Sequence, residues 1–233
     1  MYGANKNHSR LFRYYLARPA LLGKDSSMSN LKLVIFDCDG VMFDSREANR
    51  VYYNQILAHF GHPPMDTAEL DYVHMHHVMA SVSHIFRHYP DEIAAAHEYR
   101  QALDYTPFLQ HMVMEPDLLA FLDYLRPVRR TAISTNRTTT MPAILELFAL
   151  GPLFDKVVTA IDVARPKPDP EALHQILEHF GLAADEAIYI GDSEVDQEHA
   201  ARAGMRLIAF KSPGLAADYH VERFMEITRL PIF

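Results

Sequence analysis

The stretch LVIFDCDGVMFDS, residues 33–45, decides the fold, because an unbroken apolar run ends there on three aspartates within eight residues. The short β-branched run at 31–37 predicts a strand that is buried on both faces. Carboxylates at the end of a buried strand are costly unless a cation or hydrogen bonds neutralise them. The stretch therefore predicts a site where Asp37 and Asp39 meet positive charge.

The composition limits the classes of protein to which the chain can belong. Its 233 residues, 49% of them hydrophobic, suffice for one sizeable domain or for one domain with a smaller insertion. A net charge of −8 disfavours a nucleic-acid-binding surface. The single cysteine, Cys38, fits a reducing compartment, and no apolar run approaches the roughly 20 residues of a membrane span. We expect a cytoplasmic protein that binds neither nucleic acid nor membrane; the oligomeric state stays unknown.

Residues 1–30 differ from the rest, with five Lys and Arg residues against a single acid, Asp25. Basic, acid-poor leaders can be targeting segments. Met28 lies just before the first strand, however, and we favour the interpretation that translation begins there, with residues 1–27 outside the native protein. In either case residues 1–30 are an N-terminal extension.

Past residue 30, short β-branched runs alternate with helical patterns that begin at a proline and end at a glycine or proline. Such alternation predicts a parallel sheet with helices on both faces, whose ligands bind at the carboxyl ends of the strands. Asp37, Thr135 and Asp192 each follow or end a strand, so they should lie along one edge. The predicted strands are residues 31–37, 130–135, 156–160, 187–191 and 205–210.

Residues 45–115 interrupt this alternation with helical patterns and no convincing strand. The segment is too long for a βα crossover. We expect an all-helical domain inserted at the catalytic edge, with the catalytic core formed by residues 31–44 and 116–233. The predicted helices are residues 47–60, 66–89 and 91–104, and the linkers lie near 43–46 and 112–116.

The first aspartates carry a specific chemistry. A fixed Asp37 oxygen can attack phosphorus and form an acyl phosphate, if other groups stabilise the phosphoryl charge. Asp39, two residues on, can protonate the leaving oxygen and then deprotonate the water that breaks the intermediate. Gly40 permits a tight backbone path after the strand, and the negative cluster calls for a hard cation, most simply Mg²⁺.

Three later segments offer the remaining groups. Asp192 is placed to complete the cation site. Asp196 can have an outer-shell role in that site, can close a helix-capping box with Ser193, as SEVD indicates, or can do both. In AISTNR, the hydroxyls of Ser134 and Thr135 and the backbone at Asn136 can bind phosphate oxygens. Lys167, held between two prolines, can neutralise phosphoryl charge; taken alone, each of these signals is weak.

The motifs FDCDGVMFDS, ISTN, KPDP and GDSEVD, in this order and at these separations, closely resemble the four motifs of the haloacid dehalogenase-like superfamily. The resemblance covers about residues 31–211 and points to the branch that contains phosphoglycolate phosphatase and β-phosphoglucomutase. It implies an α/β fold, with a Rossmann-like three-layer α/β/α core, a parallel sheet and an inserted all-helical cap domain.

The resemblance also implies a mechanism through an aspartyl phosphate that depends on Mg²⁺. Asp37 would be nucleophile and metal ligand, and Asp39 acid/base and metal ligand through its backbone carbonyl. The remaining carried-over positions are Thr135 and Asn136 for phosphoryl binding, Lys167 for charge stabilisation, and Asp192 and Asp196 for the metal.

Several other activities compete with this interpretation. The dehalogenases lack an aspartate at the position of Asp39, and phosphonate-cleaving relatives need a cap lysine, which residues 45–115 do not contain. A phospho-acceptor signalling module needs neither Asp39 nor the insertion. We predict a phosphatase of a small phosphorylated metabolite, with a phosphomutase of the β-phosphoglucomutase type as the alternative, and a non-catalytic scaffold as a less favoured one.

The insertion is rich in histidine. On one continuous helix, His74, His77, Ser81, His84 and His88 would form one stripe, beside an apolar stripe that includes Val82 and Ile85. One interpretation places the histidine stripe over the active site, with Arg87 or Arg50 near an anionic leaving group. The other, which we favour, is a solvated helix face. A transition-metal site at His74 and His77 lacks an identifiable third ligand, and Cys38 should pack away from the site.

Overall fold

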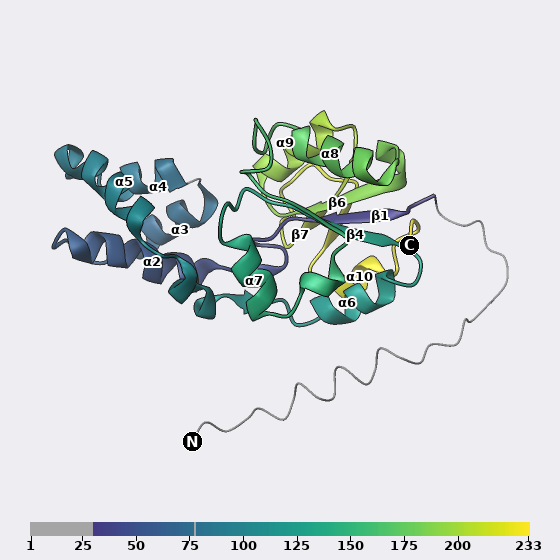
Figure 1. The fold of residues 1–233 in the computed structure, drawn as a ribbon, viewed down its shortest axis with the longest axis horizontal. Coiled ribbons are helices and arrows are strands. Elements are labelled where there is room, and N and C mark those ends of the chain that lie inside the picture. The colour runs from purple at the N-terminus through teal and green to yellow at the C-terminus, as the bar shows by residue number, and fades with distance from the viewer. Residues whose placement is uncertain (1–29, 77) are drawn as a thin grey trace, which may run out of the picture.

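A six-stranded parallel sheet forms the centre of the structure, a computed structural model that describes residues 30–76 and 78–233 (Figure 1). The strand order β5-β4-β1-β6-β7-β8 places β1 between two strands from much later in the chain. All five predicted strands are confirmed, and β8 was not predicted. The N-terminal extension falls outside the described residues, except for Asn30. The strands are β1 (Leu33–Phe36), β4 (Arg130–Ser134), β5 (Lys156–Val158), β6 (Ala187–Gly191), β7 (Arg206–Phe210) and β8 (Tyr219–Val221).

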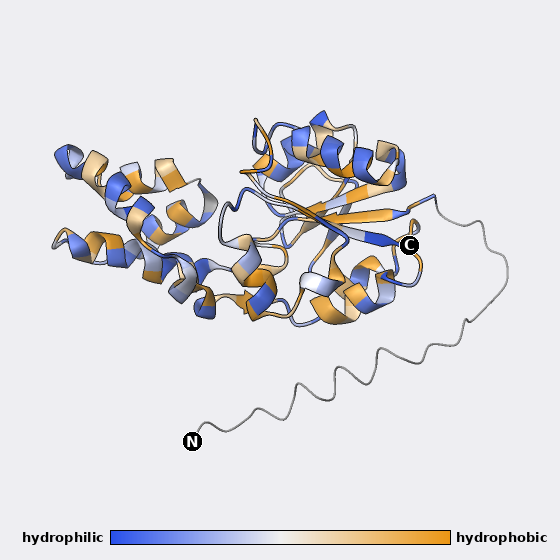
Figure 2. Cartoon of the chain, viewed as in Figure 1, coloured by the Kyte–Doolittle hydropathy of each residue, from blue (hydrophilic) through white to orange (hydrophobic). Residues whose placement is uncertain are grey.

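Helices cover both faces of the sheet, which confirms the predicted three-layer core (Figure 1). One face carries α8 (Glu171–Phe180) and α9 (Glu194–Arg202); the other carries α6 (Leu118–Leu125), α7 (Met141–Leu147) and α10 (Phe224–Ile227). Side chains of β1 alternate between the two apolar cores, with Leu33 and Ile35 on the α8 side and Val34 and Phe36 on the α6 side. All four are fully buried, so the strand is apolar throughout. Figure 2 shows the same contrast between apolar strands and amphipathic helices.

An all-helical segment separates β1 from β4 and lies beyond the carboxyl ends of the strands (Figure 1). The predicted linkers coincide with a two-stranded antiparallel sheet, in which Phe43 pairs with Met114 and Asp44 with Val113. The segment between them, residues 46–111, is called here the helical insertion. The elements are β2 (Phe43–Asp44), α2 (Arg46–His59), α3 (Thr67–Met75), α4 (Val78–Ile85), the 3₁₀ turns η2 (Pro90–Glu92) and η3 (Thr106–His111), α5 (Ile93–Ala102), and β3 (Val113–Met114).

The prediction of one continuous helix at 66–89 is wrong. The chain leaves the helical conformation at His76, whose backbone is extended (φ −117°, ψ 153°), and α4 begins at Val78. The Tyr72 ring stacks between the rings of His76 and His84, with centroids 3.8 and 3.7 Å away, so α3 and α4 fold against each other. The histidine stripe is therefore broken, and it is not uniformly solvated, because Ser81 is fully buried.

The apolar half of that prediction is confirmed, since Val82 and Ile85 are both buried in a separate core within the insertion. His77 lies outside the described residues, and so does the pairing of His74 with His77 as metal ligands. In the part of the chain that is described, His74 stands near the side chain of Asn49, with 3.5 Å between its Nδ1 and the amide nitrogen.

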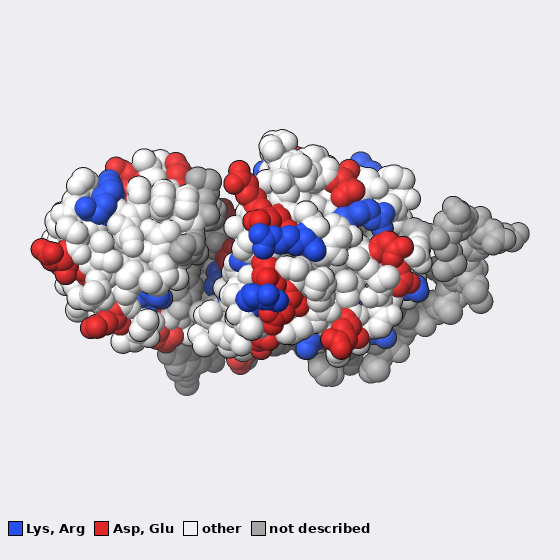
Figure 3. Space-filling model, turned by 90° about the horizontal axis from the view of Figure 1, so that it is seen from above, with Lys and Arg blue, Asp and Glu red and all other residues white. Residues whose placement is uncertain are grey.

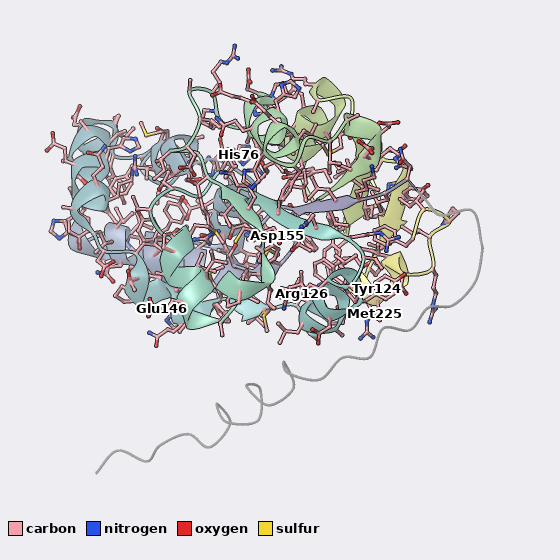
Figure 4. The ribbon with its side chains drawn as sticks, turned by 45° about the vertical axis from the view of Figure 1, so that its right-hand side comes forward. His76, Tyr124, Arg126, Glu146, Asp155 and Met225 are labelled. Carbon is pink, nitrogen blue, oxygen red and sulfur yellow. The ribbon has the colours of Figure 1, made fainter. Side chains whose placement is uncertain are left out.

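The surface carries both signs of charge. Figure 3 shows Lys and Arg interspersed with Asp and Glu, without one extended basic area on the face in view. Tyr124 and Met225, from α6 and α10, are partly exposed on the core away from the helical insertion (Figure 4). None of the helices within residues 30–76 and 78–233 has the length and apolar character that crossing a membrane requires.

Phe36 packs the central strand against α6, α10 and the segment before β5, and we expect its loss to destabilise the fold. Its ring lies 5.6–6.0 Å from the rings of Phe121, Phe154 and Phe224, and it is fully buried. Phe36→Ala should lower the free energy of unfolding by about 3–5 kcal/mol, because a cavity replaces these contacts. Denaturant unfolding measures the change. Leu147→Ala, at a site 54% exposed, is the control, and equal effects of the two substitutions would contradict the assignment.

Candidate active site

The predicted site residues gather at the carboxyl edge of the central strands. Asp37 directly follows β1, Thr135 follows β4, and Asp192 follows β6. The chain proceeds outward from β1 to β4 and β5 and then returns to β6 on the other side of β1. Such a reversal opens a crevice at the strand ends, where ligands of α/β sheets bind. The edge thus has the position expected of a binding site.

Gly40 lets two of the aspartate motifs approach each other. Its φ of +74° lies in the left-handed region, which a residue with a Cβ adopts only with strain. A Cβ added at Gly40 would also overlap the Asp192 carboxylate. The turn after Asp39 therefore requires glycine for two reasons, and Asp192 occupies the space that a side chain would fill.

Asp37, Asp192 and Asp196 form a compact acidic cluster, with ligand oxygens within 4.8 Å of one another. Burial raises the pKa of Asp37 to about 7, and the charges of Asp196 and Asp39 add to the rise while Lys167 opposes it. Burial also raises the pKa of Asp192 to about 8, again with help from the neighbouring carboxylates. Carboxylates packed this closely resist ionisation unless a positive charge lies beside them. A hard divalent cation such as Mg²⁺ would supply that charge, and it prefers oxygen ligands.

Lys167 supplies the positive charge already present in this cluster. Its buried ammonium donates hydrogen bonds to Asp37 Oδ1 (2.7 Å), Asp196 Oδ1 (2.8 Å) and the Tyr189 hydroxyl (2.9 Å). Burial alone would lower the pKa of Lys167, but the charges of Asp196 and Asp37 more than offset it and raise the pKa. All three N–H groups of the ammonium are used, so its position is fixed from three sides.

Two roles were predicted for Asp196, one in a helix cap and one in the metal site, and the structure bears on them differently. The capping box with Ser193 is confirmed. Its Oδ2 accepts from the Ser193 hydroxyl and from backbone N–H groups of Asp192 and Ser193, and its Oδ1 accepts from Lys167 and Tyr189. With both oxygens so fully engaged, Asp196 is better suited to hold Lys167 than to bind a metal directly.

The loop after β4 closes the side of the site opposite the acidic cluster. Thr135 is buried, and its hydroxyl accepts a hydrogen bond from the backbone N–H of Arg137 (3.2 Å). The Asn136 side chain donates to the carbonyl of Lys167 (3.1 Å), so it fixes the lysine loop, in addition to the backbone role predicted for it. The structure therefore joins the second and third motifs directly.

A buried polar layer lies beneath the site, and most of it was not predicted from the sequence. Because a carbonyl only accepts, His199 Nδ1 donates to the Asp169 carbonyl (2.7 Å), and Nε2 accepts from the Ser134 hydroxyl (3.0 Å). Burial, together with the charge of Lys167, lowers the pKa of His199 to about 4, so the ring is neutral. The signal in the sequence was Tyr189 within the apolar run 187–191, since a buried polar group needs a partner; the polar helix around His199 gave no such signal.

Asp39 forms an ion pair with Arg137, a residue absent from the predicted site. Arg137 Nε donates to Oδ2 (2.7 Å) and Nη2 to Oδ1 (2.6 Å). Burial raises the pKa of Asp39, but the charge and hydrogen bonds of Arg137 outweigh that effect and lower it. The available signal was position alone, because Arg137 directly follows the motif ISTN.

The other candidates lie outside this arrangement. Cys38 is fully buried in the apolar core, and burial raises its pKa well above the ordinary value. In the insertion, Arg50 pairs with Glu47 and Arg87 with Glu69, each at 2.5 Å. Within the residues that the structure describes, the acidic cluster is the only group of three or more His, Cys, Asp or Glu residues arranged to hold a metal ion.

Known proteins resemble the part of the chain that contains these residues. The model of the family described as haloacid dehalogenase-like hydrolase matches residues 34–210. The phosphoglycolate phosphatase of Cereibacter sphaeroides is 29% identical over 197 residues, or 80% of this chain and 88% of that protein. Validoxylamine A 7'-phosphate phosphatase of Streptomyces hygroscopicus subsp. limoneus is 27% identical over 198 residues, or 84% and 90%. The crystal structure of a HAD-superfamily hydrolase, subfamily IA, variant 1, from Geobacter sulfurreducens PCA has 38% identity and a TM-score of 0.78, covering 88% of this chain and 99% of that one.

The raised pKa values predict how stability depends on pH without a metal. Asp37 and Asp192 hold their protons more tightly when folded than when unfolded, where their pKa is 3.8, so their stabilisation is lost as pH rises through about 7 and 8. In EDTA, the free energy of unfolding should fall by roughly 1–2 kcal/mol between pH 7 and 9. Asp192→Asn should remove most of this slope in denaturant titrations. An unchanged slope in that variant would contradict the assignment.

Proposed function

The chain belongs to the haloacid dehalogenase-like hydrolase family, in its phosphoglycolate phosphatase-like branch, and it is a phosphatase; we propose that it hydrolyses a small phosphomonoester through an aspartyl phosphate on Asp37. The observation that carries this proposal is the state of Asp37. Lys167 holds one of its oxygens at 2.7 Å, which fixes the carboxylate and leaves the other oxygen for attack on phosphorus. A nucleophile held in one orientation needs little further ordering when substrate binds.

Mg²⁺ is part of the proposal. Asp37, Asp192 and the backbone carbonyl of Asp39 would hold it, and when bound it would neutralise charge on the phosphoryl oxygens. Asp196 would contribute indirectly, by holding Lys167. The crowded, high-pKa carboxylates support a cation at this position more than any single residue does.

The reaction then needs two proton transfers, which we assign to Asp39. Because Arg137 keeps Asp39 ionised in the resting site, Asp39 takes up a proton from solvent when substrate binds. As Asp37 attacks phosphorus and the P–O bond to the alcohol breaks, Asp39 gives that proton to the leaving oxygen. The Asp39 carboxylate then takes a proton from a water molecule, whose oxygen attacks the phosphorus of the aspartyl phosphate. Phosphate leaves, and Asp37 is regenerated. Thr135 and Asn136, at the end of β4, would bind the phosphoryl oxygens, and Lys167 would stabilise their charge.

The helical insertion would act as the cap over this site. It lies past the carboxyl ends of the strands, where the alcohol part of a substrate would extend, and the two linkers join it to the core on that side (Figure 1). The two named relatives act on different phosphomonoesters, so the substrate class proposed is a small phosphorylated metabolite. A cytoplasmic location completes the proposal and is supported by the single, buried cysteine.

Asp37→Asn is the direct test. Phosphate release from a panel of sugar phosphates, phosphoglycolate and nucleotides should need Mg²⁺, stop in EDTA and resume when Mg²⁺ returns. The variant should lose turnover by at least about 1,000-fold, because the amide cannot form the acyl phosphate, while its circular dichroism spectrum stays that of the wild type.

Asp123→Asn is the matched control, since Asp123 is exposed on α6 and should tolerate the same change. Turnover that survives in Asp37→Asn or in EDTA would refute the mechanism. A wild type that releases no phosphate from any compound would redirect the search to a phosphomutase, assayed with a bisphosphate activator.

A further inference from the structure

The ion pair between Arg137 and Asp39 has the geometry of a positioning device. Two parallel N–H groups of one guanidinium contact the two oxygens of one carboxylate, at 2.7 and 2.6 Å. Such a two-point contact fixes the plane and the rotation of a carboxylate more firmly than a single hydrogen bond does. Asp39 is the residue to which the proposed function assigns both proton transfers.

The two partners differ in their access to the site. The Arg137 side chain is 9% exposed and that of Asp39 is 38% exposed, so the guanidinium lies behind the carboxylate. A carboxylate has about four lone-pair positions, of which Arg137 uses two. The remaining ones are available to a leaving group or a water molecule.

Arg137 is in turn held from several sides. Its Nη1 donates to the Thr140 hydroxyl (3.2 Å), and its guanidinium lies 5.6 Å from the centre of the Tyr105 ring. Its Nη2 also lies 3.6 Å from the sulfur of Met112, next to the second linker. Contacts from both the core and the insertion therefore fix the guanidinium, which makes it a rigid support for Asp39.

We propose that Arg137 is a positioning residue that holds the Asp39 carboxylate in the orientation required for both proton transfers. The proposal rests on the proposed function. Without Arg137, the Asp39 side chain would rotate freely, and the steps that need a proton moved would slow. Attack by Asp37 on a substrate whose leaving group departs without a proton would continue, because Lys167 and not Arg137 orients Asp37.

Two substrates, assayed with the full-length protein and Mg²⁺, distinguish an effect on proton transfer from an effect on attack by Asp37. Glycerol phosphate has a leaving group that must be protonated, and p-nitrophenyl phosphate has one that leaves as an anion. In Arg137→Gln, kcat for glycerol phosphate should fall about 100-fold. With p-nitrophenyl phosphate, a burst of nitrophenolate close to one equivalent of enzyme should appear, larger than in the wild type, followed by slow turnover. The burst is expected because only the second half of that reaction needs Asp39.

Arg137→Lys keeps the charge without the two-point contact, so it should show the same pattern with a smaller loss, about 10-fold for glycerol phosphate. Arg130→Gln is the matched control, because Arg130 pairs with Asp155 at the opposite end of β4 and is 65% exposed. It should leave both substrates unaffected. Thermal melts establish that each variant is folded.

The outcomes are distinct. Equal loss on both substrates without a burst, or unchanged turnover of glycerol phosphate in a folded Arg137 variant, would overturn the positioning role and leave the proposed function standing. A wild type that hydrolyses neither these compounds nor the metabolite panel would instead overturn the proposed function, and the inference with it.

Discussion

The arrangement of buried charge around Lys167 is the constraint on which the rest of the site depends. Four carboxylates, from Asp37, Asp39, Asp192 and Asp196, meet two cations, Lys167 and Arg137, at one edge of the sheet. When all six groups are ionised, four negative charges and two positive charges give the site a net charge of −2. Two of the carboxylates respond with raised pKa values, as expected of like charges in a buried place. One divalent cation would bring the net charge to zero. The charge balance and the oxygen ligands therefore both favour a divalent cation at this edge.

The division of labour among the carboxylates follows from their hydrogen bonds rather than from their types. Asp196 is saturated by donors and serves to hold Lys167; Asp39 faces the opening, with Arg137 behind it. Burial of Lys167 is tolerated only because two carboxylates and a hydroxyl accept from it, since an unpaired buried charge would cost several kcal/mol. Tyr189 thus has its place in the site despite lying inside a strand.

Much of this could be predicted from the sequence, because the main signals are local. A β-branched run that ends on Asp37, and prolines and glycines that bound the helices, specify the strands and the sheet edge without knowledge of distant contacts. The ion pair of Arg137 with Asp39 joins residues 98 positions apart, and only the fold brings them together. The helix break at His76 likewise depends on Tyr72 stacking between two rings, which a periodic pattern does not contain. The edge strand β8 has only three residues, which is too few for a periodic pattern, and it depends on pairing with β7.

The backbone holds Asp37, the proposed nucleophile, differently from Asp39, the proposed acid/base, and the difference matters for movement of the insertion. Asp37 is bound to the sheet, since its N–H donates to the carbonyl of Ile190 (2.9 Å) in β6. Asp39 lies four residues before the start of β2, and the N–H of Gly40 donates to the Phe43 carbonyl (2.8 Å) within the first linker. The Arg137 side chain beside Asp39 also reaches Met112, next to the second linker. A shift of the helical insertion would therefore act first on Asp39 and leave Asp37 in place, which is the order that the proposed mechanism requires of a cap closing over a bound substrate.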